Sequence, residues 1–137
     1  MIARHIHFDR SALNDTDASD LIDVSHTAAR KETGFEYDLF VSKRLYHELI
    51  AWDTADTKKQ KIEQDEAVRL WNVLQMLKVR MMKPTFGCNN YFYNLYAIAR
   101  DGESVHAKKH ELKAVVKASA IQGVHIVISF LGETMHD

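Results

Sequence analysis

Cysteine, proline and glycine are scarce in this 137-residue chain, which has one cysteine, one proline and five glycines. With Cys88 alone, the chain can form neither an intramolecular disulfide nor a zinc site built from several cysteines, so a reducing compartment fits best. No apolar run approaches the roughly 18 residues that a membrane-spanning helix needs. The first residues mix charged and apolar side chains from Arg4 onward, unlike a signal peptide. We therefore expect a soluble cytoplasmic protein that does not enter a membrane.

Net charge is also nearly absent from the chain. Its 18 Lys and Arg residues and 19 Asp and Glu residues leave a formal charge of -1, which provides no long-range attraction for nucleic acid or an anionic membrane. Hydrophobic residues make up 46% and charged residues 27%, close to the average of globular proteins. We predict a single domain over residues 1–137, in which any binding patch is local.

Signature motifs of catalysis are missing as well. The sequence has no glycine-rich phosphate loop, no G-x-S-x-G elbow and no H-E-x-x-H zinc motif. Two histidine pairs, His5 with His7 and His106 with His110, have metal-like spacing but no evident carboxylate or thiolate partner. We therefore predict no catalytic residue, no metal site and no cofactor. An enzyme with dispersed Asp, Glu and His residues leaves no such signature, so a hydrolytic enzyme stays open as an alternative.

The first half of the chain shows brief strand patterns. Alternation over residues 2–8 indicates a short strand, and the Asp-, Ser- and Thr-rich residues 9–23 indicate a surface loop. Residues 35–42 alternate as a half-buried strand does.

Two short helices flank that second strand. Ser25 is placed to cap a helix over residues 26–33, which ends at Gly34. Ser42 is placed to cap a second helix over residues 43–52.

The longest predicted element is a helix over residues 58–82, which stops before Pro84 because proline disfavours helix at the preceding residue. Apolar side chains recur in it at helical spacing and place one of its faces in the core. That face consists of Ala67, Leu70, Trp71, Leu74, Leu77 and Met81.

The chain changes to strand periodicity after Gly87. Aromatic and β-branched side chains fill residues 90–100, 111–119 and 124–131, and Asp-Gly and Gln-Gly turn signals separate these segments. Strands in close succession pair as an antiparallel meander. We therefore predict an α+β fold, with an antiparallel sheet of three to four strands packed against one long central helix and two shorter N-terminal helices.

The start of the long helix, QDEAVRLWNVLQML at residues 64–77, raises the question of whether its polar groups form a site. On a helical wheel they divide into two rows. The outer row consists of Asp65, Arg69 and Asn72, and the inner row consists of Gln60, Glu63 and Gln64. The outer row suits either an exposed ion pair or a partner-binding stripe in which Arg69 anchors a carboxylate or phosphate. The inner row either overhangs the sheet into solvent or lines a cleft.

The run YFYNLY at residues 91–96 presents two rows of side chains, because successive residues of a strand face opposite ways. One row belongs to the core and the other to a half-exposed surface, and Tyr91 and Tyr93 are candidate residues for a protein contact. A nucleic-acid stacking platform needs basic neighbours, and only Arg100 is close in the sequence. Lys108, Lys109 and Lys113 belong to the one basic patch, which is either a solvated hairpin or a surface that contacts the phosphates of nucleic acid.

The segment QDEAVRLWNVL, residues 64–74, resembles the most distinctive segment of a family of small bacterial proteins found on plasmids, phages and other mobile elements. The resemblance continues through residues 21–53 and, more weakly, through residues 96–102. This chain departs from the family pattern at Ala67-Val68, where a small residue and often glycine precedes the arginine, and at Asn72, where the family has aspartate. The family has no established activity, and the resemblance implies a small accessory or anti-defence protein.

These observations together lead to an expected function. We expect a small non-enzymatic interaction protein of a mobile element that binds a host protein complex. A small-ligand or nucleotide-binding module at the Gln60, Glu63 and Gln64 end of the long helix is the alternative. Unpaired strand edges leave a homodimer open.

Overall fold

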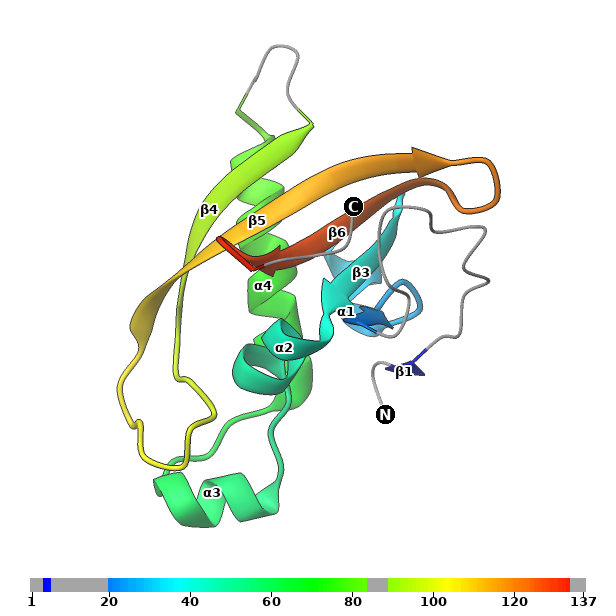
Figure 1. The fold of residues 1–137 in the computed structure, drawn as a ribbon. Coiled ribbons are helices and arrows are strands. Elements are labelled where there is room, and N and C mark those ends of the chain that lie inside the picture. Colours follow the sequence, from blue (N-terminus) through cyan, green and yellow to red (C-terminus); the bar gives the residue numbers. More distant parts are fainter. Residues whose placement is uncertain (1–3, 6–19, 84–88, 134–137) are drawn as a thin grey trace.

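A six-stranded mixed sheet organises the computed structural model, which describes residues 4–5, 20–83 and 89–133 (Figure 1). The strands are β1 (Arg4–His5), β2 (Leu21–Asp23), β3 (Asp38–Ser42), β4 (Asn90–Ala97), β5 (Lys108–Ser119) and β6 (Gly123–Phe130). Their order across the sheet is β1-β2-β3-β6-β5-β4. β3 and β6 pair in parallel, and every other neighbouring pair is antiparallel.

The predicted α+β class is confirmed, but the predicted sheet of three to four antiparallel strands is wrong in its size and in one pairing. The C-terminal meander of β4, β5 and β6 forms as expected, with Leu112 and Ala114 of β5 in the core. The prediction of a loop over residues 9–23 is wrong for β2, because three residues are too few to show alternation. Leu21 and Ile22 of β2 are buried on opposite faces of the sheet. Of the predicted strand over residues 2–8, the described part is β1, and the rest lies outside the described residues.

The first helix, α1 (Ala28–Thr33), is shorter by two residues than expected, because its cap is Thr27 and not Ser25. The Thr27 hydroxyl accepts a hydrogen bond from the Arg30 amide, whereas the Ser25 hydroxyl bonds the backbone of Leu39. Gly34 ends the helix as predicted. Its φ of 77° lies in the left-handed region, and its amide donates to the carbonyls of Arg30 and Lys31.

The second predicted helix divides into the single turn α2 (Lys43–Leu45) and the π-helical turn η2 (Tyr46–Ile50). Ser42 caps it as predicted, by accepting a hydrogen bond from the Leu45 amide at 3.1 Å. In the wider turn the Ala51 amide donates to the Tyr46 carbonyl, five residues earlier. The turn buries Tyr46, Leu49 and Ile50 against the sheet.

The predicted long helix over residues 58–82 is two helices, α3 (Thr54–Gln60) and α4 (Glu66–Met81). Lys61 breaks the helix with a left-handed φ of 56°, and a new cap restarts it at Asp65. The Asp65 carboxylate accepts a hydrogen bond from the Val68 amide at 3.1 Å. The chain therefore turns between the helices, and α4 ends before Pro84, which lies outside the described residues.

One core lies between the sheet and the helices α1, α4 and η2, and Figure 1 shows α4 behind β4 and β5. The core side of α4 consists of Leu70, Val73, Leu74 and Leu77, which are fully buried. The prediction that Ala67 and Trp71 share this side is wrong, because Ala67 is exposed and Trp71 is 36% exposed.

Candidate functional site

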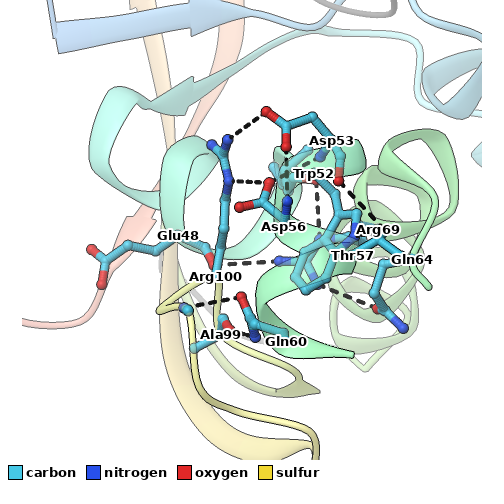
Figure 2. A network of polar contacts seen from close by, with 12 residues as sticks. Glu48, Trp52, Asp53, Asp56, Thr57, Gln60, Gln64, Arg69, Ala99 and Arg100 are labelled. Carbon is cyan, nitrogen blue, oxygen red and sulfur yellow. Dashed lines mark hydrogen bonds and ion pairs between the residues drawn. The ribbon is translucent and has the colours of Figure 1, made fainter. Parts of the chain in front are cut away.

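Arg69 of α4 lies at the centre of a buried polar network (Figure 2), and only 4% of its surface is exposed. Its guanidinium donates from Nε to the Ile50 carbonyl at 3.1 Å and from Nη1 to the Ile98 carbonyl at 2.9 Å. It also donates to the backbone carbonyl of Glu48 and to the side-chain amide oxygen of Gln64, both at 3.3 Å. The predicted exposed pair of Asp65 with Arg69 is wrong, because Asp65 caps the helix and Arg69 points inward.

The Trp52 ring forms one wall of the Arg69 site. The Arg69 guanidinium carbon lies 4.8 Å from the centre of that ring, in cation–π geometry. The indole N–H in turn donates to the Thr57 hydroxyl at 3.0 Å, so the ring orientation is fixed from α3. Burial lowers the pKa of Arg69 to about 10, and the nearby charge of Arg100 acts in the same direction. The guanidinium therefore keeps its charge at neutral pH.

Gln60, the last residue of α3, is buried and fastens the helix to residues 99–104. Its amide nitrogen donates to the carbonyls of Ala99 and Ser104 at 2.9 and 2.7 Å, and its oxygen accepts from the Gly102 amide at 3.1 Å. Both amide protons and the oxygen are thus in use. The side chain of Gln60 therefore serves these backbone contacts, and a ligand cleft at this end of the helix stays a prediction.

Arg100 closes the network toward solvent. Its Nε donates to the Asp56 carboxylate at 2.6 Å, its Nη2 lies 3.3 Å from the Asp53 carboxylate, and its backbone amide donates to the Glu48 carbonyl. Asp53 and Asp56 also form the capping box of α3. The backbone N–H of Asp56 is the main cause of the lowered pKa of Asp53. These contacts join η2, α3, α4 and the segment after β4, and this closed arrangement acts as a structural joint.

The remaining predicted residues at this end fall on the surface. Glu63 and Asn72 are exposed, and Gln64 is half-buried and bonded to Arg69. The predicted rows therefore do not form one site, since Gln60 and Arg69 are used inside the joint while Glu63 and Asn72 face solvent.

The outer side of α4 is an open surface that carries no charge over three turns. We call it the α4 outer face, and it consists of Val68, Trp71, Asn72, Gln75, Met76, Val79 and Met82. The exposed fraction of its large apolar residues ranges from 36% at Trp71 to 74% at Met82. Between Ala67 and Leu77 the single charged residue is Arg69, which is buried. Sequence reasoning missed this face because Trp71 was assigned to the core.

The aromatic rows of β4 are assigned by the structure. Tyr93 is buried and donates its hydroxyl to the Val73 carbonyl at 3.1 Å, and burial raises the pKa of Tyr93 above its usual value. Tyr91 packs against the core, with the Arg80 guanidinium over its ring at 5.8 Å. The predicted contact residues Tyr91 and Tyr93 therefore lie on the core side of β4, and the outward-facing row begins with Phe92.

A polar hollow lies beside η2, has a volume of about 470 Å³, and brings several titratable side chains together. Most of these side chains already have partners. Arg44 pairs with Glu48 at 2.8 Å, and Glu133 accepts hydrogen bonds from the Ser42 hydroxyl and the Phe130 amide. His110 lies 3.1 Å from the Ala97 carbonyl. The hollow thus has the character of a hydrogen-bonded surface depression.

Within the described ranges, no group of three or more His, Cys, Asp or Glu side chains could hold a metal ion, and His7 and Cys88 lie outside those ranges. None of the described helices is long and apolar enough to span a membrane. Comparisons with known protein families, curated proteins and solved structures gave no match, so the resemblance of residues 64–74 to a mobile-element family stays a prediction.

Proposed function

We propose that this chain is a non-enzymatic interaction protein that binds a partner protein on the α4 outer face. The observation that carries the proposal is the uncharged, exposed apolar surface of a helix whose opposite side is fully buried. Contiguous exposed apolar surface is uncommon on proteins that act alone, and the centres of interfaces are depleted in charge.

The ends of α4 indicate the chemistry of the partner. Exposed acidic side chains precede the helix at Glu63 and Asp65, whereas exposed Lys83 follows it. A complementary partner therefore presents an uncharged apolar helix or groove, with basic groups facing the start of α4 and acidic groups facing its end.

A photo-crosslinking amino acid at position 79 tests the proposal in cells that produce the protein. Val105 provides a matched control site, because it is also valine and is 42% exposed, compared with 44% for Val79. The expected result is one partner that crosslinks from position 79 and not from position 105. The purified complex should then weaken about tenfold or more with Val79→Lys and stay unchanged with Val105→Lys.

Lysine suits this test because it is a good helix former, so the free energy of unfolding of Val79→Lys should lie within about 0.5 kcal/mol of that of the wild type. Equal binding by Val79→Lys and the wild type would refute a site on α4. Sedimentation that shows a dimer broken by Val79→Lys would identify a second copy of this chain as the occupant and would overturn a different partner.

A narrower form of the proposal rests on the resemblance of residues 64–74 to proteins of mobile elements. In this form the partner belongs to a host complex that the mobile element must block. Phage plaque counts on a defence-carrying strain that expresses the protein provide the test. More plaques with the wild type than with Val79→Lys are expected, and equal counts would refute the anti-defence role.

A further inference from the structure

The outward side of β4 and β5, which we call the β4–β5 face, combines exposed aromatic rings with lysines. Phe92 is 50% exposed and Tyr96 is 67% exposed. Both residues face outward because Tyr93 and Leu95 between them are buried, and neighbouring strand residues point to opposite sides. In Figure 1 the helix α4 lies behind these strands, so this face is on the other side of the sheet from the α4 outer face.

We propose that the β4–β5 face binds single-stranded nucleic acid. The two rings are four residues apart in one strand, which at the strand rise places them roughly 13 Å from each other. Each exposed ring offers a surface on which one unpaired base can stack, and such stacking tolerates any base.

The strand register places a lysine beside each ring. Lys113 of β5 is directly opposite Phe92, and Lys109 is directly opposite Tyr96. Cross-strand neighbours have Cβ atoms about 5 Å apart, so each ammonium group reaches the phosphate that follows a stacked base. The sequence alone does not show that the lysines lie beside the rings, because they follow Tyr96 by more than ten residues in the chain.

The local charge of β5 favours an anionic ligand even though the whole chain is nearly neutral. The outward row of β5 contains three lysines, Lys109, Lys113 and Lys117, and one acidic residue, Glu111. Glu111 is opposite Asn94, midway between the two rings. A carboxylate accepts hydrogen bonds from exocyclic amino groups such as that of cytosine, so this pair can contact the edge of a base that lies between the stacked ones.

Unpaired strands fit this face better than duplex does. In a duplex the flat faces of the bases are covered by their neighbours, so Phe92 and Tyr96 would find no stacking partner. Phosphate contacts by lysines alone would bind duplex and single strands in a similar way, and this difference provides a test.

Fluorescence anisotropy with labelled RNA and DNA strands of about 12 nucleotides, and with a duplex of the same length, measures the binding. We expect the full chain to bind at least one of the single strands more tightly than the duplex. Tyr96→Leu, which keeps apolar volume but removes the ring, should weaken binding roughly 5-fold to 100-fold. Tyr37→Leu is the matched control, because Tyr37 is also exposed but lies outside the face, and it should leave binding unchanged.

The lysines are tested by salt dependence. Between about 50 mM and 200 mM salt the affinity should fall, and the double variant Lys109→Gln with Lys113→Gln should reduce the slope of log K against log salt by about 1.4. Circular dichroism confirms that these surface variants stay folded.

Three outcomes would overturn this proposal. They are no binding to either single strand at about 50 mM salt, equal binding by Tyr96→Leu and the wild type, and equal affinity for duplex. Val79→Lys lies on the α4 outer face and should bind the strands normally. A failure here therefore leaves the proposed protein partner untouched, and the reverse also holds.

Discussion

Truncation of Arg69 to alanine is expected to be among the most destabilising single changes in the chain. The variant removes the donors for the carbonyls of Ile50 and Ile98, which lie in the joint between η2, α4 and the end of β4. The Glu48 carbonyl loses one donor but keeps the backbone amide of Arg100. Two carbonyls are therefore left without the partner that the structure gives them.

The size of the effect follows from opposing contributions. Leaving the Ile50 and Ile98 carbonyls without donors costs about 2 kcal/mol each. Loss of the contact with the Trp52 ring adds about 1 kcal/mol, and the cavity adds about 2 kcal/mol. Truncation also removes a charge whose burial is unfavourable, and the lowered pKa of Arg69, to about 10, puts this relief at about 3 kcal/mol. The net loss is about 4 kcal/mol, or a melting temperature lower by roughly 14 °C for a chain of this length.

Urea denaturation followed by far-ultraviolet circular dichroism and tryptophan fluorescence measures this loss. Arg69→Lys should keep only part of the stability, because one ammonium group cannot replace a planar guanidinium that donates in several directions. Arg44→Ala is the control. The Arg44 side chain is 62% exposed and pairs with Glu48 at the surface, so its loss should lower the free energy of unfolding far less than the loss of Arg69 does.

The reasoning would be refuted if Arg69→Ala cost less than about 1 kcal/mol, or no more than Arg44→Ala. Such a result would mean that the carbonyls find water or that the relief of the buried charge cancels the lost hydrogen bonds.

Two further predictions concern pH. Burial raises the pKa of Tyr93, so the contribution of its hydroxyl to stability is complete below the ordinary tyrosine pKa of about 10 and is lost as pH rises above it. At neutral pH, Tyr93→Phe should lower the free energy of unfolding by about 1 kcal/mol, because its hydrogen bond to Val73 is lost. In urea titrations at alkaline pH, the stability of Tyr93→Phe should decline less steeply with pH than that of the wild type. If the stability of Tyr93→Phe declines at alkaline pH as steeply as that of the wild type, other groups cause the decline. Hydrogen bonds from the Ser104 hydroxyl and amide lower the pKa of Asp101 to about 2, so its contribution is present above the ordinary aspartate value and is lost as pH falls toward 2. Asp101→Asn should therefore flatten the acid side of the curve of melting temperature against pH, and an unchanged acid slope would contradict this role.

Local patterns were sufficient for the elements whose stabilising contacts are local. The C-terminal strands follow from their alternation and turn residues, and the caps at Ser42 and Gly34 follow from residues whose side chain or φ value suits that position. The parallel pairing of β3 with β6 leaves no such pattern, because it joins segments that are far apart in the chain.

The misassigned face of α4 has a specific cause. The predicted apolar face, which includes Ala67 and Trp71, puts Arg69 on the outer side of the helix, whereas the fully buried positions are centred nearer Leu70 and Leu77. Val73 was the available signal, because adding it to the apolar set rotates the buried arc toward Arg69. Three of the four hydrogen-bond partners of the Arg69 guanidinium are backbone carbonyls, which every residue type has, so these contacts could not be read from the sequence.

The parallel pairing at the centre of the sheet also has a consequence for the order of events during folding. Gln122, just before β6, donates a hydrogen bond to Asp38 at the start of β3, 84 residues earlier. Until β6 has been synthesised, β3 has an unpaired edge, and its apolar residues Leu39, Phe40 and Val41 lack the neighbour that covers them. Contacts between such distant segments slow folding, and an exposed apolar edge can pair with other chains. A nascent chain that stops before β6 is therefore expected to aggregate more readily than the finished chain, and a chaperone that covers β3 would act before β6 pairs with it.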